Sequence, residues 1–245
     1  MIEVRRRSEI VVNSDMGEGF GLHSFGNDKA LMPLIDVANV ACGFHSGEPE
    51  TMDATVALAK EHGVRVGAHP GLPDLVGFGR REMKISPAEV EAMIRYQVGA
   101  LTGFLEKYGI PLNHIKPHGS LYGMLARDED LMQGAVNVAK TYGVPVFGMA
   151  GSAHQRVAER EGVEFIGELY VDLNYGADGG LIILRRPENT DPAAASARVR
   201  RALQDGRVLA EDGTLLDISF GSICVHSDTP NSPEVALAIR QTLGE

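Results

Sequence analysis

The sequence has no apolar run long enough to form a membrane-spanning helix. None of its stretches approaches the roughly 18 consecutive apolar residues that crossing a bilayer requires. Residues 1–10 carry three arginines but lack the apolar core of a secretory signal. We therefore expect a soluble protein that works in the cytoplasm and does not bind a membrane.

An excess of positive charge is also missing. The chain has 23 Lys and Arg residues against 33 Asp and Glu residues, which gives a net charge of −10. This balance argues against a nucleic-acid-binding surface, while a local basic pocket for an anionic substrate stays compatible with it. Cysteine is scarce, and Cys42 and Cys224 both lie in apolar runs. We expect buried free thiols in a reducing compartment, with a disulfide between them as the alternative.

Motifs for phosphate and zinc binding are absent. The sequence contains no G-x-x-x-x-G-K-[ST], so a loop of that type does not hold ATP if the protein uses it. The glycines at 17, 19 and 21 lack the G-x-G-x-x-G spacing, and nearby acidic residues would repel a pyrophosphate. Neither H-E-x-x-H nor H-x-E-x-H occurs, although a metal site assembled from separate strands needs no local motif.

What the chain contains is a regular alternation of short apolar runs and amphipathic stretches. The expected strands are 10–12, 36–41, 64–68, 114–116, 144–149, 163–169 and 218–225. The expected helices are 48–62, 86–108, 128–142, 152–161, 191–204 and 232–243. A Gly-rich bend at 176–180 opens an expected hairpin with 181–184. About seven βα units without a linker predict one α/β domain over residues 1–245 with a parallel sheet.

Polar side chains follow nearly every expected strand, which favours a β/α barrel over an open sheet. An open doubly wound sheet obeys the same alternation but concentrates its site at one switch point. In a barrel, the residues after all the strands converge on one mouth. The strongest signal is NHIKPHGSLY at 113–122, where Lys116 ends a short strand and His118 and Tyr122 follow it. Similar strand ends occur at GFHSG, GAHPG and CVHSD.

The residues at these strand ends are the candidate site. They are Asn13, Asp15, Glu18, Asn39, His45, His69, Lys116, His118, Tyr122, Asp172, His226 and Asp228, joined by Arg80 from the irregular loop 70–83. Two chemistries fit and stay open. One is a divalent metal site with Asp15, His45 and His69 as ligands. The other is metal-free acid–base catalysis, in which Lys116 holds an anion or an oxyanion.

The remaining histidines are expected to have no catalytic role. His23 lies in a loop, and His62 lies at a helix end near the negative end of the helix dipole. We expect His154 on an exposed helix and His114 on the exterior of the barrel.

Six long motifs carry a resemblance to a known family. They are NSDMGEGFG, ANVACGFHSGEP, GAHPGLPDLVGFGRR, YQVGAL, HIKPHGSLY and CVHSDTP, and in this order they cover nearly the whole chain. The sequence resembles the LamB/YcsF family, which includes the A-type component of bacterial 5-oxoprolinase. The resemblance implies a distorted seven-stranded β/α barrel of the glycoside hydrolase/deacetylase type.

The resemblance also implies an activity and partners. It implies the ATP-dependent opening of a cyclic amide, 5-oxo-L-proline or a related lactam, in complex with two other subunits of B and C type. ATP is expected to bind through that complex. The matching site positions are Asp15, His45, His69, Lys116 and His118. Our own assignment makes Asp15 the general base, His45 and His69 proton carriers or metal ligands, and Lys116 with His118 oxyanion or carboxylate contacts.

Three positions depart from the family pattern. Val11 and Leu173 stand where the family usually has Asp and Arg, and Ser227 replaces a glycine. Loss of an acid and of an arginine near the mouth is compatible with a different lactam or amide. Two alternatives therefore stay open. They are a stand-alone metal-dependent amidohydrolase or deacetylase, and a non-catalytic substrate-binding subunit.

Overall fold

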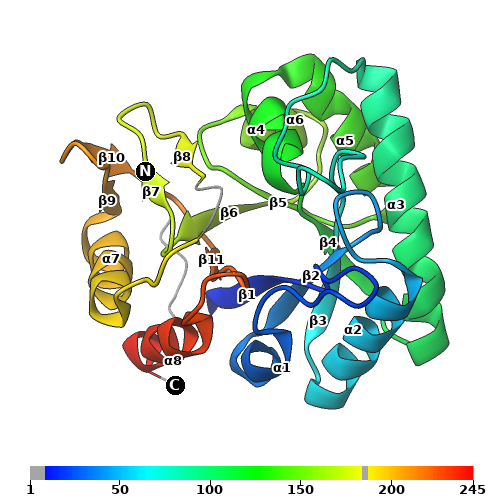
Figure 1. Cartoon of the computed structure of the whole chain (residues 1–245). Helices are drawn as coiled ribbons and strands as arrows, with labels where there is room; N and C mark the ends of the chain where they lie inside the picture. Colours follow the sequence, from blue (N-terminus) through cyan, green and yellow to red (C-terminus); the bar gives the residue numbers. More distant parts are fainter. Residues whose placement is uncertain (1–8, 184–186, 245) are drawn as a thin grey trace.

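The barrel predicted from the sequence is present in the computed structural model, which describes residues 9–183 and 187–244. Seven parallel strands close in the order β1-β11-β6-β5-β4-β3-β2, and β2 pairs with β1 (Figure 1). The strands are β1 (Val11–Met16), β2 (Val37–Ala41), β3 (Arg65–His69), β4 (Leu112–Ile115), β5 (Val146–Gly148), β6 (Phe165–Tyr170) and β11 (Ser222–Cys224). The predicted seven-stranded barrel is thus confirmed.

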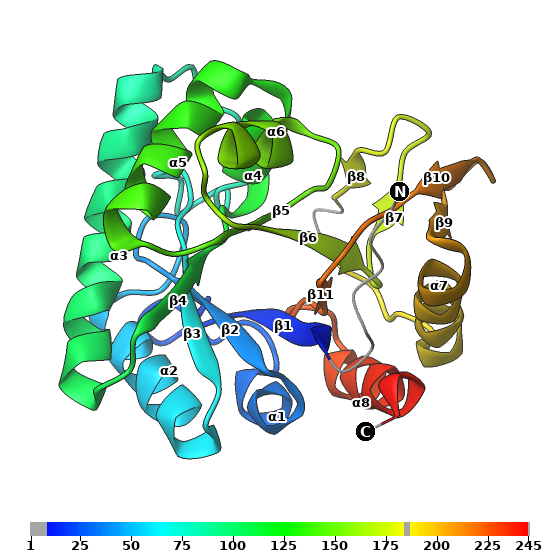
Figure 2. The same ribbon diagram turned by 180° about the vertical axis from the view of Figure 1, so that it is seen from behind.

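Helices cover the outside of the barrel, as Figures 1 and 2 show from opposite sides. They are α1 (Asp28–Leu31), the 3-10 turn η2 (Met32–Leu34), α2 (Pro49–His62), α3 (Pro87–Tyr108), α4 (Gly119–Arg127), α5 (Glu129–Tyr142), α6 (Ala153–Arg160), α7 (Pro192–Asp205) and α8 (Ser232–Leu243). Two antiparallel hairpins complete the fold. They are β7 (Asn174–Tyr175) with β8 (Leu181–Ile182), and β9 (Arg207–Leu209) with β10 (Leu215–Asp217).

Capping residues explain where the predicted helices begin. α3 begins after Ser86, whose hydroxyl accepts from the Glu89 amide while the Glu89 carboxylate accepts from the Ser86 amide. Gly109, in the left-handed conformation with φ 65°, ends the same helix. In five of the six predicted helices the first residue of the expected range is the N-cap, and the helix itself begins one residue later. For Ser86 and Asp191 this capping role was expected.

Apolar side chains fill two separate places. The main core lies between the strands and the surrounding helices. A smaller cluster consists of Val37, Phe147 and Ile166, with Val11 packed against it. Side chains alternate across a strand, so Asn39 lies on the same face of β2 as Val37 but nearer the carboxyl end. The smaller cluster therefore forms the floor of the barrel interior, and polar side chains lie above it.

This polar layer corrects our prediction for His114. His114 is fully buried, lies 2.7 Å through Nε2 from Asn39 Oδ1, and stacks on Phe147 with ring centroids 3.9 Å apart. It therefore faces the barrel interior, and the exterior placement was wrong. The physical reason is the strand period, because residues 114 and 116 share one face and Lys116 is also inside. Asn13 joins the layer by donating to Glu168 at 3.0 Å.

The structure also tests the expectations for His154, for the segment after Pro117, for the hairpin and for the two cysteines. His154 is fully buried rather than exposed, with its Nε2 3.0 Å from the carbonyl of Tyr122. No helix was expected after Pro117, yet α4 starts at Gly119, so Tyr122 is helical. The hairpin at 181–184 is confirmed for Leu181–Ile182, while Leu184 lies outside the described residues. Both cysteines are buried free thiols, as expected.

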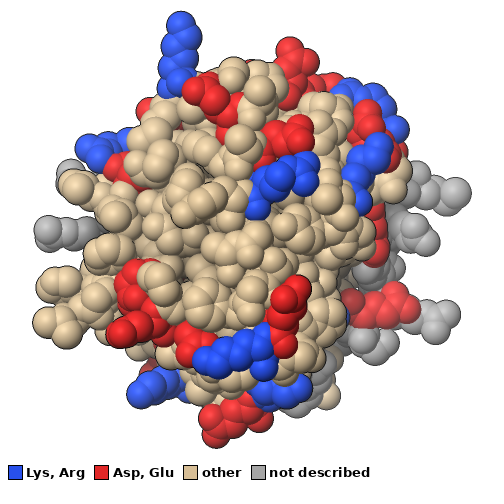
Figure 3. Space-filling model, turned by 90° about the vertical axis from the view of Figure 1, so that its right-hand side faces the viewer, with Lys and Arg blue, Asp and Glu red and all other residues tan. Residues whose placement is uncertain are grey.

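The surface carries charges of both signs. Figure 3 shows the face that looks to the right in Figure 1, where acidic and basic side chains are interspersed above and below a broad uncharged area. Within residues 9–183 and 187–244, no helix is long and apolar enough to cross a membrane.

Candidate active site

A cavity of about 350 Å³ opens at the carboxyl ends of the strands. Its wall includes most of the predicted site residues: Asp15, Glu18, His69, Arg80, Lys116, His118, Tyr122, Asp172, His226 and Asp228. The ring of His45 lies behind this wall and lines a neighbouring hollow. Asn13 and Asn39 lie deeper, in the polar layer, where they hold the groups above them.

Lys116 lies at the centre of the barrel interior. Its side chain is only 2% exposed, and Nζ lies 2.9 Å from Asp15 Oδ1 and 3.3 Å from Glu168 Oε1. Nζ also lies 3.1 Å from the sulfur of Cys224. Burial alone would lower the pKa of Lys116, but the charges of Asp15, Cys224 and Glu168 raise it well above its usual value. Lys116 is therefore a permanent buried cation between two carboxylates.

Both carboxylate oxygens of Asp15 have polar neighbours. Oδ1 accepts from Asn39 at 2.7 Å and from Lys116, while Oδ2 lies 3.4 Å from His69 Nε2 and 3.6 Å from His226 Nε2. Burial alone would raise the pKa of Asp15, but His69 and Lys116 hold it well below its usual value. The carboxylate thus stays ionised, and its low pKa makes it a weak base.

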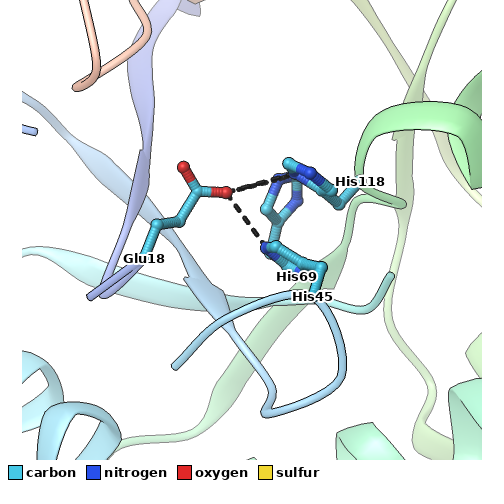
Figure 4. A group of neighbouring side chains, drawn as sticks. All are labelled: Glu18, His45, His69 and His118. Atoms are coloured by element: carbon cyan, nitrogen blue, oxygen red, sulfur yellow. Dashed lines mark hydrogen bonds and ion pairs between the residues drawn. The ribbon is translucent and has the colours of Figure 1, made fainter. Parts of the chain in front are cut away.

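Glu18 and three histidines form a compact cluster (Figure 4). Glu18 Oε1 lies 3.0 Å from His45 Nε2, 3.1 Å from His118 Nδ1 and 3.8 Å from His69 Nε2. His69 Nε2 and His118 Nδ1 are themselves 3.0 Å apart. Burial raises the pKa of Glu18, but the hydrogen bonds with His118 and His45 lower it below its usual value overall. We call these four residues the His–Glu cluster.

Main-chain carbonyls fix the tautomers of two of these rings. His69 Nδ1 donates to the carbonyl of Lys116 at 2.7 Å, and His118 Nε2 donates to the carbonyl of Phe78 at 2.8 Å. In the neutral rings, the two nitrogens that face each other therefore carry no hydrogen. Two bare nitrogens at 3.0 Å, with Glu18 beside them, require a cation. It is either an extra proton on one ring or a metal ion.

The donor set of the His–Glu cluster fits a divalent metal. The four ligand atoms lie within 4.8 Å of one another, and imidazole nitrogen with carboxylate oxygen is a common zinc set. The rings of His45 and His118 are stacked 3.7 Å apart at 3°, so these two rings would not both direct a nitrogen at one ion. Glu18, His69 and His118 are thus the better set, which differs from the expected Asp15, His45 and His69.

A second group of predicted residues lines the same cavity. Asp172 accepts from the His226 main chain at 2.6 Å and lies 2.8 Å from His226 Nδ1. Burial alone would lower the pKa of His226, but Asp172 raises it to about 9. Arg80 pairs with Asp228 at 3.1 Å. The structure therefore places the predicted charged residues together, largely as neutralised pairs.

Sequence reasoning missed two charged residues of this region. Glu168 contacts Lys116 from β6, and a charged residue inside an apolar strand was a signal that could have revealed it. Arg198 reaches the cavity wall from α7. It lies among other arginines on a polar helix, and nothing in the sequence distinguishes it from a solvated residue.

The family model described as LamB/YcsF family matches residues 10–245. The chain belongs to the LamB/YcsF family. Among LamB/YcsF relatives, the lactam utilization protein lamB of Emericella nidulans is 45% identical, with 98% of this chain and 96% of the relative covered. The A component of 5-oxoprolinase from Thermus thermophilus is 42% identical, with 96% of each chain covered.

A solved structure of this family has the same fold. The crystal structure of the lactam utilization protein from Thermus thermophilus is 40% identical, covers 96% of both chains and superposes with a TM-score of 0.87. The LamB/YcsF barrel therefore extends over nearly the whole chain.

Proposed function

We propose that this LamB/YcsF protein is the A-type component of an ATP-dependent 5-oxoprolinase, which opens 5-oxo-L-proline or a related lactam to the amino acid. The observation that carries the proposal is the convergence on one small cavity of Asp15, Glu18, His69, Lys116 and His118. Relatives that are named as A components of 5-oxoprolinase, and that match over nearly their full length, support it. The cavity of about 350 Å³ suits a small ligand.

The chemistry explains the need for ATP. An amide carbonyl is a poor electrophile, and transfer of the γ-phosphoryl group of ATP to its oxygen activates the carbon and releases ADP. Water then adds to that carbon, and the ring C–N bond breaks as the nitrogen takes a proton. Hydrolysis of the resulting acyl phosphate gives the free carboxylate and phosphate. The protein must therefore supply a base, an acid and stabilisation of negative charge.

Within the proposal, we assign these roles to residues that line the cavity. The bare Nε2 of His69 takes the proton from water, and Asp15 Oδ2 at 3.4 Å stabilises the resulting imidazolium. His118, paired through Nδ1 with Glu18, gives a proton to the leaving nitrogen. Lys116 stabilises the developing oxyanion. The low pKa of Asp15 argues against the base role that we gave it from the sequence, so it becomes a partner of His69 and Lys116.

The phosphoryl donor comes from outside this chain in the proposal. The sequence has no phosphate-binding loop of the G-x-x-x-x-G-K-[ST] type. The relatives are named as one lettered component of 5-oxoprolinase, which indicates a multi-subunit enzyme. We assign ATP binding and lactam phosphorylation to two partner subunits of B and C type.

Reconstitution tests the proposal. The full chain is mixed with the two partner subunits, ATP and ¹³C-labelled 5-oxoproline, and glutamate formation is followed by NMR. We expect ATP-dependent glutamate, and a loss of about 10²–10⁴-fold in His118→Ala. His62→Ala, at the exposed end of α2, is the control and keeps full activity. Absence of glutamate in an assembled wild-type complex with ATP would refute the assignment.

A second candidate is a metal-dependent amidohydrolase that acts without partners. The bare nitrogens of His69 and His118 beside Glu18 favour it, since these atoms need a cation. A bound divalent ion would lower the pKa of a coordinated water. Elemental analysis of freshly purified protein, with thermal unfolding in the presence and absence of a chelator, tests it. About one equivalent of metal with ATP-independent amide hydrolysis would favour this candidate, while ligand binding without turnover would favour a non-catalytic role.

A further inference from the structure

The cavity wall carries three Lys or Arg side chains among the described residues, and two of them already face carboxylates. Lys116 lies between Asp15 and Glu168, and Arg80 pairs with Asp228. Arg198 differs, because no carboxylate of residues 9–183 or 187–244 lies within ion-pair distance of its guanidinium. A substrate anion that enters this cavity therefore finds at Arg198 a positive charge that no carboxylate of the described residues pairs with.

The surroundings of Arg198 hold its guanidinium in one orientation. Nη1 donates to the carbonyl oxygens of Tyr170, the last residue of β6, and of Leu173, which lies just before β7. The guanidinium also lies over the ring of Tyr175, 5.8 Å from its centroid. Within the described part of the chain, Nε and Nη2 make no hydrogen bond. Arg198 thus presents unused donors from a half-buried, fixed position, which is the arrangement that recognises a carboxylate.

Among the described residues, the acidic groups near Arg198 do not form an ion pair with its guanidinium. Asp172 follows Tyr170 in the chain but is paired with His226. Glu188 and Glu211 line the same cavity, are exposed to solvent, and form no ion pair with Arg198. Burial lowers the pKa of Arg198, as expected for a guanidinium that lacks a counter-ion. A bound carboxylate would offset the cost of burying this charge.

We propose that Arg198 forms a carboxylate-binding subsite of the cavity, separate from the His–Glu cluster that acts on the amide. The ligand class is a small molecule with one carboxylate and one amide. This inference deepens the proposed function and rests on it, since 5-oxoproline has both groups. It moves the carboxylate contact away from Lys116 and His118, to which we had assigned it from the sequence. It also predicts that lactams without a carboxylate bind weakly.

Calorimetric titration of the full chain tests the subsite. The probes are 5-oxoproline, 2-pyrrolidinone (the same lactam without the carboxylate) and N-acetylalanine, an acid with an open-chain amide. We expect Arg198→Gln to weaken 5-oxoproline binding by about 10- to 100-fold and to leave 2-pyrrolidinone binding unchanged. Arg198→Lys should recover part of the affinity. Arg201→Gln, on the exposed surface of the same helix, is the matched control and should bind like wild type.

The outcomes separate this inference from the proposed function. Equal loss of 5-oxoproline and 2-pyrrolidinone binding in a folded Arg198→Gln protein would overturn the subsite, and so would unchanged 5-oxoproline binding. Failure of wild type to bind either acid would also overturn it. Arg198-dependent binding of N-acetylalanine by a protein that ignores 5-oxoproline would support the subsite and refute the 5-oxoprolinase assignment.

Discussion

Lys116 lies inside the barrel and contacts Asp15, which lines the cavity at the barrel mouth. A buried ammonium is tolerated here because Asp15 and Glu168 surround it, and it in turn helps to hold the pKa of Asp15 well below its usual value. Asp15 can then orient His69 without titrating near neutral pH. The buried cation thus helps to keep Asp15, which lines the cavity, in its charged form.

Replacing Lys116 should therefore affect stability as well as activity. Lys116→Ala leaves Asp15 and Glu168 buried without their cation, which we expect to lower the free energy of unfolding by about 3–5 kcal/mol. Urea denaturation measures this change. Lys107→Ala, which removes a solvent-exposed pair with Asp53, should lower the free energy of unfolding far less. Equal effects of the two substitutions would contradict the buried-cluster interpretation.

The pair of His226 and Asp172 should make stability depend on pH. The pKa of His226 is raised from 6.5 to about 9, so its contribution is fully present below about pH 6.5 and is lost as pH rises through about 9. The loss amounts to at most about 3 kcal/mol. We expect the difference in unfolding free energy between wild type and His226→Gln to be large at pH 6 and small at pH 10.

Denaturation at both pH values provides the test. His62→Gln serves as the control, because His62 lies exposed at the end of α2 and should show no such pH-dependent difference. A difference that is the same at pH 6 and pH 10 for His226→Gln would show that the charge of His226 is not responsible.

Single residues were predictable where they follow a strand. The repeated strand–His–Gly pattern located His45, His69 and His118, because parallel strands deliver their ends to one mouth. Residues on the sides of elements were not predictable. Whether His114 faced inward depended on the register of β4, and the role of Arg198 depended on which face of α7 meets the cavity. Neither is encoded in residue type alone.

At the scale of elements, helix starts were accurate because their signals are local. Ser86 and Glu89 form the capping box that their spacing predicts. α4 was missed because its first residues, Gly119 and Ser120, are poor helix formers that also suit a loop. Here tertiary packing decides, since the amide of Ser120 donates to the carbonyl of Gly79 in the neighbouring loop. Local propensity could not reveal that contact.

Two glycines should respond in opposite directions to alanine. A Cβ at Gly67 in β3 would collide with the ring of His114, whose movement would break its contact with Asn39. We expect Gly67→Ala to destabilise the protein by about 1–3 kcal/mol. Gly103 in α3 has open space around it, and Gly103→Ala should stabilise the protein by about 1 kcal/mol. Thermal unfolding of the two variants measures both effects, and a stable Gly67→Ala would contradict the packing of His114.

At the scale of the whole molecule, closure of the sheet creates the site. β1 pairs with both β2 and β11, so Asn13 meets Glu168 and Ser222 from the far end of the sequence. An alternating βα pattern allows an open sheet equally well, so the pattern alone only favoured the barrel. The family resemblance made that expectation firm. The partners and the substrate depend on surfaces and contacts that no local pattern specifies.

The central claim is that the barrel mouth performs the water-addition half of an ATP-dependent lactam opening. The most direct measurement is glutamate formed per ATP hydrolysed in a complex reconstituted from this chain and the two partner subunits. We predict that His69→Ala assembles normally but lowers glutamate formation by about 10²–10⁴-fold. Wild-type rates of glutamate formation from a complex that carries His69→Ala, or from the partner subunits alone, would contradict the account.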